Sequence, residues 1–188
     1  MMDEQLVLPR HIYEEIIRHA REGYPEEVCG LLSGTDDRVT GLYRARNIAE
    51  DRVMNYTVDP HTLLKQIEFE ERGERMVAIY HSHPVSPPYP SATDARQAFY
   101  PDTVYIICSL QDWDAPEMRG WRLVQQEAQR AERLPEGVPT VRGQWGFWAQ
   151  HVPLGEGRAR YDLWWDEGGR LWRQQVDVWE VRLVVEET

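Results

Sequence analysis

The stretch His81-Ser82-His83-Pro84-Val85-Ser86-Pro87-Pro88-Tyr89-Pro90-Ser91-Ala92-Thr93-Asp94 decides how the rest of the chain is interpreted. The short apolar run 76–80 precedes it and predicts a buried strand. Side chains two positions apart on a strand point to the same side, so His81 and His83 can face one point in space. The prolines between 84 and 90 predict a stiff loop, and Asp94 then lies at the start of a helix as the natural third ligand. Two imidazoles and one carboxylate, with a fourth position open, are typical of a catalytic zinc site.

Length and composition restrict the class of protein. The chain has 188 residues, of which 41% are apolar and 28% charged, values that are ordinary for a globular protein. A net charge of −11 argues against nonspecific binding to nucleic acid or to an anionic membrane. No stretch approaches the roughly 18 apolar residues of a membrane span. The first residues lack the basic start and apolar stretch of a signal peptide, so we expect a cytoplasmic protein.

Two cysteines, Cys29 and Cys108, both lie in apolar runs that predict strands. Cysteines in apolar strands of a protein expected to be cytoplasmic are more often buried free thiols than partners in a disulfide. Cys29 is close in sequence to the candidate site, but its setting fits a packed small residue better than a nucleophile.

Periodicity predicts the order of the elements in the first two thirds of the chain. Apolar residues at helical spacing predict a helix over 10–22, and a second helix is expected over 61–72 after a loop at 47–60 with a short strand near 56–58. A third, short helix is expected over 93–99. The expected strands cover 27–34, 39–45, 76–83, 103–109 and 118–124.

The character of the sequence changes after this region. Residues 126–140 are polar and contain Pro and Gly, which predicts a linker with a short helix near its start. Six of the eight tryptophans follow residue 140, and apolar residues alternate with polar ones over much of 141–188. We therefore expect a first domain at 1–125, a linker at 126–140 and a small antiparallel β-meander at 141–188.

The quoted residues resemble a known family. Glu-Val-Cys-Gly at 27–30, His-Ser-His-Pro at 81–84 and Ser-Ala-Thr-Asp at 91–94 occur in the order found in JAMM (MPN-plus) metallopeptidases. The resemblance covers about residues 8–124. It implies the cytidine-deaminase-like JAMM/MPN fold, an α/β (α+β) arrangement with a mixed sheet flanked by helices, to which 141–188 would add a small antiparallel β extension.

The resemblance also implies a role for each residue of the motif. His81, His83 and Asp94 would bind one zinc ion per chain. Glu27 would hold and deprotonate the attacking water, and Ser91 would donate a hydrogen bond to the oxyanion of the tetrahedral intermediate.

Each role has a simpler competitor when the residues are considered alone. Glu26 could be the active carboxylate instead of Glu27, because sequence does not fix the register of the strand. Ser91 and Asp94 have the spacing of a capping box at a helix start. His81 and His83 could be ordinary polar residues at the end of a strand.

The family resemblance implies a zinc-dependent hydrolase. Its substrate would be the peptide or isopeptide bond after the C-terminal glycine of a ubiquitin-like or sulfur-carrier protein with a Gly-Gly tail, sometimes with release of cysteine. The rival interpretations are a zinc peptidase for other small peptides and a noncatalytic MPN scaffold. The tryptophan-rich segment 141–188 could cover the catalytic domain, recruit a substrate or mediate a homodimer.

Overall fold

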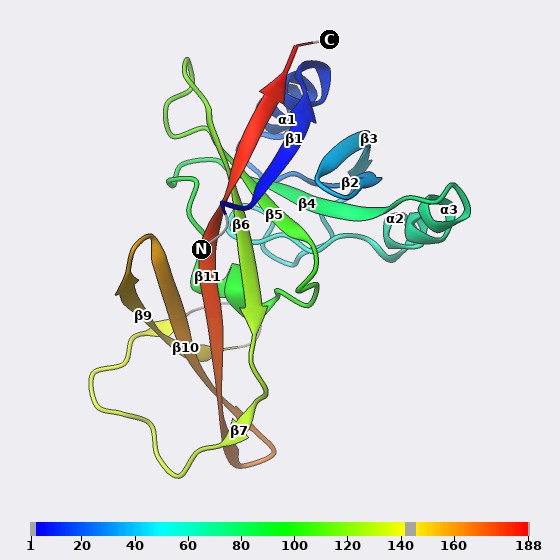
Figure 1. The fold of residues 1–188 in the computed structure, drawn as a ribbon. Coiled ribbons are helices and arrows are strands. Elements are labelled where there is room, and N and C mark those ends of the chain that lie inside the picture. The colour runs from blue at the N-terminus through cyan, green and yellow to red at the C-terminus, as the bar shows by residue number, and fades with distance from the viewer. Residues whose placement is uncertain (1–2, 142–145, 188) are drawn as a thin grey trace. The chain divides into compact units, whose positions relative to one another are not determined.

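The computed structural model describes residues 3–141 and 146–187 (Figure 1). Part of the predicted segment 141–188 therefore lies outside the described residues, at 142–145 and 188. In chain order the elements are β1 (Gln5–Pro9), α1 (Arg10–Gly23), β2 (Cys29–Thr35), β3 (Arg38–Ala45), α2 (Pro60–Leu63), α3 (Lys65–Glu71), β4 (Arg75–His83), α4 (Ala92–Arg96), β5 (Val104–Ser109), β6 (Glu117–Gln125), β7 (Gln129–Arg130), β8 (Thr140–Val141), β9 (Phe147–Gly155), β10 (Arg158–Glu167) and β11 (Arg170–Glu186).

The chain divides into two compact units. The first comprises Met1–Tyr89, Asp102–Trp121 and Val181–Thr188, and the second comprises Pro90–Pro101 and Arg122–Glu180. The unit boundaries fall within β6 and within β11, so each of these strands begins in one unit and ends in the other. The domains predicted from the sequence, at 1–125 and 141–188, are bounded differently from these two units and remain a prediction.

The first unit contains a mixed sheet with the strand order β1-β3-β2-β4-β5-β6. Strand β2 pairs antiparallel with β3 and β4, β4 runs parallel to β5, and β5 pairs antiparallel with β6. Figure 1 shows β1 beside the end of β11, and these two strands pair in parallel from Gln5↔Arg182 to Pro9↔Glu186. The expected α+β class with a mixed sheet is confirmed.

Helix α1 covers the core of the first unit. Ile12, Ile16 and Ala20 recur at a spacing of four, so they lie on one face of the helix, and all three are buried. They pack in one apolar cluster with residues of the sheet strands, among them Leu32 and Ile106. The predicted helix over 10–22 is confirmed, and its buried face fixes it against the strands that lead to the site.

The second unit contains an antiparallel arrangement of strands. Strand β10 pairs with β9 and with β11, and the short strands β8 and β7 pair with β9 and β11. Gly168 and Gly169 join β10 to β11 with positive φ angles of 61° and 75°, the conformation of a two-residue hairpin turn. Leu163, Val176 and Val178 are buried within this unit. The expected antiparallel β extension is confirmed.

Three expectations need correction. The helix over 61–72 is two short helices, α2 and α3, which meet at Leu64, and Asp59 caps the first by accepting a hydrogen bond from the Thr62 N–H. The helix over 93–99 begins at Ala92 and ends at Arg96. The sequence interpretation contained no strand at 5–9, because its three apolar residues are too few to show a period.

The short helix expected near residue 126 is wrong. The backbone N–H of Gln126 donates to the Gln175 carbonyl and that of Ala131 to the Leu171 carbonyl, so this segment runs extended beside β11. Pairing with a distant strand therefore overrides local helix propensity here. Within the described ranges, no helix has the length and apolar character that a membrane crossing requires.

Candidate metal centre

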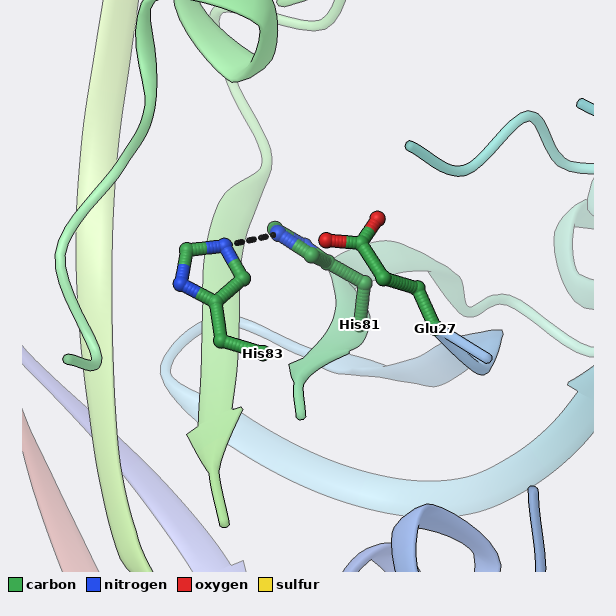
Figure 2. Close-up of side chains that lie close together, drawn as sticks. All are labelled: Glu27, His81 and His83. Carbon is green, nitrogen blue, oxygen red and sulfur yellow. Dashed lines mark hydrogen bonds between the residues drawn. The ribbon is translucent and has the colours of Figure 1, made fainter. Parts of the chain in front are cut away.

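Three buried side chains of the first unit point toward one another (Figure 2). Glu27 precedes β2, and His81 and His83 lie at the end of β4. Their ligand atoms all lie within 4.8 Å of one another, and the residues are only 6%, 0% and 3% exposed. A carboxylate and two imidazoles at this separation form a group that could hold a metal ion.

Strand pairing explains why residues so far apart in sequence meet. Strands β2 and β4 are antiparallel, and Cys29 lies opposite His81. Beyond that pair, the N–H of Ser82 donates to the Val28 carbonyl (3.0 Å), and the N–H of Val28 donates to Ser82 Oγ (2.8 Å). The chain segment that carries Glu27 is therefore fixed alongside the two histidines. The sequence interpretation missed Ser82, because a serine between two histidines gives no signal of its own.

The orientation of the histidine rings fits metal binding. His83 Nδ1 lies 2.8 Å from the Pro87 carbonyl oxygen. A carbonyl can only accept, so Nδ1 carries the proton and Nε2 presents a lone pair, which is the usual support of a metal-bound histidine. The Nε2 atoms of His81 and His83 lie 3.0 Å apart. Two nitrogens bound to one tetrahedral zinc at about 2.0–2.1 Å would be about 3.3 Å apart, so the donor set fits such an ion.

Glu27, rather than Glu26, faces the histidines. The side chain of Glu26 is 45% exposed and pairs with Arg52 at 3.3 Å. Glu27 is buried, its N–H donates to the Arg52 carbonyl (2.7 Å), and its carbonyl accepts from Asn47 Nδ2 (2.9 Å). The structure thus distinguishes two carboxylates that sequence alone left open.

Ser91 and Asp94 belong to the second unit and form a capping box at the start of α4. The N–H of Asp94 donates to Ser91 Oγ (3.0 Å), and the N–H of Ser91 donates to Asp94 Oδ2 (2.8 Å). The helix-cap interpretation is therefore correct for both residues. Their assignments as oxyanion donor and third metal ligand remain predictions.

Cys29 lies beside the site but is not poised for chemistry. Burial, followed by the nearby carboxylates of Asp59 and Glu27, raises the pKa of its thiol to about 12. The thiolate, which is the form that attacks or binds metal, is therefore disfavoured at neutral pH. Both Cys29 and Cys108 are buried and free, as expected from the sequence.

Residues 9–124 match the family model of prokaryotic homologs of the JAB domain, Prok-JAB. The chain belongs to this family. The match contains all five residues of the predicted site, and the predicted JAMM/MPN membership is confirmed. Residues 125–188 extend beyond the Prok-JAB match.

Several known proteins resemble this Prok-JAB chain over the same region. It is 38% identical to a desampylase from Haloferax volcanii over 132 residues, which cover 63% of this chain and 95% of the relative. It is 35% identical to the CysO-cysteine peptidase from Mycobacterium tuberculosis over 122 residues, which cover 63% of this chain and 83% of the relative. A solution structure of a protein from Desulfitobacterium hafniense superposes with a TM-score of 0.57 at 34% identity, covering 63% of this chain and 84% of that one.

Proposed function

We propose that this Prok-JAB protein is a zinc-dependent hydrolase of the bond that follows the C-terminal glycine of a ubiquitin-like or sulfur-carrier protein. The observation that carries the proposal is the buried carboxylate of Glu27 within reach of two imidazoles. The names of the relatives support the substrate class, since one is a desampylase and the other a CysO-cysteine peptidase. Both peptide and isopeptide bonds are included, because the leaving group is an amine in either case.

His81 and His83 would hold the ion through Nε2, and the sequence motif assigns Asp94 as the third ligand. A bound zinc ion would act as a Lewis acid and lower the pKa of water to about 7. Each histidine would bind the ion through a nitrogen lone pair and would therefore be neutral, so neither imidazole transfers a proton in this scheme.

Glu27 would carry the proton through the reaction. Its carboxylate accepts a proton from the attacking water as the water oxygen bonds to the scissile carbonyl carbon. The protonated Glu27 then gives this proton to the leaving nitrogen as the carbon–nitrogen bond breaks, so the carboxylate is regenerated. The motif further assigns the Ser91 hydroxyl as a hydrogen-bond donor to the oxyanion, a contribution typically of about 3–4 kcal/mol in such sites.

The proposal is tested with purified, zinc-loaded protein incubated with carrier–lysine and carrier–cysteine conjugates, with the products identified by mass. Glu27→Gln should retain zinc at about one ion per chain and lose at least about 10³-fold in kcat. Glu26→Gln is the matched control, since this exposed neighbour should leave kcat within about twofold. Equal activity of wild type and Glu27→Gln would refute the assigned base.

The ligand assignment is tested by metal analysis. The double variant His81→Ala, His83→Ala should contain no stoichiometric zinc, whereas unchanged zinc would show that the ion is held elsewhere. A zinc-loaded wild type that cleaves unrelated small peptides but no carrier conjugate would favour the general peptidase. A protein that holds zinc and cleaves neither substrate would favour the noncatalytic scaffold.

A further inference from the structure

Asn47 lies in the loop between β3 and α2, and its side-chain amide is fully used. Nδ2 donates to the carbonyl oxygens of Glu27 and Asn55, both at 2.9 Å, and makes a longer contact of 3.5 Å with the Arg52 carbonyl. Oδ1 accepts from the N–H groups of Ala49 (3.0 Å) and Thr57 (3.1 Å). An amide side chain offers two donor hydrogens and two acceptor lone pairs, so one residue satisfies four separate backbone groups. This network defines the shape of the loop.

The same loop holds the backbone of Glu27 on both sides. Glu27 precedes the first residue of β2, Cys29, so the pairing of β2 does not reach it. Its N–H donates to the Arg52 carbonyl (2.7 Å), and its carbonyl accepts from Asn47. The loop therefore supplies the two backbone hydrogen bonds that a neighbouring strand would supply within a sheet.

The loop also supports one of the histidines. Tyr56, which is 8% exposed, stacks on the His81 ring with centroids 4.2 Å apart and an angle of 19° between the planes. Its sequence neighbours Asn55 and Thr57 are both hydrogen-bonded to Asn47. The amide of Asn47 is thus connected to Glu27 directly and to His81 through the stacked tyrosine ring.

The base of the loop is closed independently of Asn47. Asp59 accepts hydrogen bonds from the N–H of Arg46 (2.8 Å) and from the hydroxyl of Thr62 (2.7 Å). Burial opposes the charge on Asp59, but these hydrogen bonds and that from the Thr62 N–H outweigh burial and lower its pKa. A change at Asn47 should therefore alter the inner part of the loop without releasing its ends.

We propose that Asn47 is a positioning residue that sets the place of the Glu27 carboxylate and of the His81 ring through the loop 47–57. The proposal rests on the function proposed above for Glu27 and His81. A positioned carboxylate must lie within hydrogen-bond reach of the water whose proton it takes, and small displacements of such groups reduce kcat strongly. Substrate contacts are not part of the role, so KM should change little.

The test compares Asn47→Asp and Asn47→Ala with wild type. Asp keeps the size and the two acceptor contacts of Asn47 but loses both donor contacts, including that to Glu27. Ala loses all four contacts and introduces no charge. We expect both variants to lower kcat by about 10- to 100-fold with KM within about threefold, and to weaken zinc affinity by about tenfold in competition with a chromophoric chelator.

A second readout does not depend on activity. Cobalt-substituted protein should show a changed visible absorption spectrum in both variants, because the spectrum reports the geometry of the ligands around the ion. Thr103→Val is the matched control. The Thr103 hydroxyl donates to the Met76 carbonyl (3.2 Å) at the other end of β4 from the histidines. This control should lower stability while leaving kcat, zinc affinity and the cobalt spectrum as in wild type.

The proposal is overturned if kcat, zinc affinity and the cobalt spectrum are unchanged in both Asn47 variants. A loss of stability alone, as expected for Thr103→Val, would show a merely structural role. Should Asn47→Ala fail to fold, the Asp variant alone decides in the same way. If wild type cleaves no conjugate, the proposed function is refuted, and the zinc affinity and cobalt spectrum still decide whether Asn47 positions the site.

Discussion

Acidification should destabilise the first unit through His19. This residue lies on α1, and its Nδ1 is 2.7 Å from the hydroxyl of Tyr80, a fully buried residue of β4. Burial raises the pKa of Tyr80, so its phenol keeps its proton and donates it to Nδ1. Burial, aided by the positive charge of Arg44, lowers the pKa of His19 to about 4. Protonation of His19 would therefore place a hydrogen on Nδ1 opposite the hydrogen that the Tyr80 phenol donates.

The sign and size of the effect follow from linkage. The unfolded chain binds this proton below about pH 6.5, whereas the folded chain binds it only below about pH 4. The contribution to stability is fully present above pH 6.5 and is lost as the pH falls from 6.5 to 4. For a completely buried group, the difference between the pKa values of the unfolded and folded chains would correspond to about 3.4 kcal/mol of stability. Because the His19 ring is partly exposed, solvent screening reduces this, and we expect about 1–2 kcal/mol.

The assay is urea unfolding of metal-free protein at about pH 7.5 and about pH 4. Other groups titrate in this range, so the measured quantity is the difference between wild type and His19→Gln. The glutamine oxygen can accept from Tyr80 without gaining a proton. The free energy of unfolding of the variant should therefore fall by about 1–2 kcal/mol less than that of wild type on acidification. An equal loss in the two proteins, or an NMR titration of His19 near its ordinary value, would refute the reasoning.

Three further experiments test the packing. Val181→Ala should lower the free energy of unfolding by about 1–3 kcal/mol, because this side chain is only 1% exposed in the core of the first unit. Gly30→Ala should cost at least about 1–3 kcal/mol, since its Cβ would overlap the ring of Tyr80, and combining it with Tyr80→Leu should cost less than the sum of the two single changes. Cys29 and Cys108, both with pKa raised to about 12 chiefly by burial, should resist alkylation by iodoacetamide at neutral pH until the protein is unfolded.

Each of these has a distinguishing control. Val85, which is 69% exposed, should tolerate replacement by alanine within about 0.5 kcal/mol, and an equal loss at both valines would contradict the assigned burial. Strictly additive effects of Gly30→Ala and Tyr80→Leu would argue against direct overlap. Rapid labelling of the native protein would show that at least one thiol is accessible.

Local pattern was sufficient for two of the three residues of the candidate centre. The two histidines could be placed on one side of a strand because the side-chain period of a strand is two. Glu27 could not be placed in this way, since its approach to His81 depends on the register between β2 and β4, which is set by distant pairing. The sequence motif supplied that assignment. The role of Asn47 lay beyond sequence, because its four partners come together only when the loop is closed.

The same distinction applies to the fold. Helix α1 was predictable because its apolar period is continuous over three turns. Strand β1 has three apolar residues, and its parallel partner is the end of β11, so nothing local marks it. The segment at 126–131 has the composition of a linker, yet pairing with β11 makes it extended. Local rules failed where a strand takes its conformation from a remote partner.

The parallel pairing of β1 with the end of β11 has a consequence for synthesis. The two segments are separated by 177 residues, as between Gln5 and Arg182. At translation rates of about 5–20 residues per second, the partner of β1 emerges roughly 10–35 s after β1 itself. During that interval the exposed edge of Gln5–Pro9 can bind chaperones or pair wrongly. A messenger truncated before the codon of Val181 would therefore yield a chain that contains the whole sequence motif but lacks the end of β11 that pairs with β1.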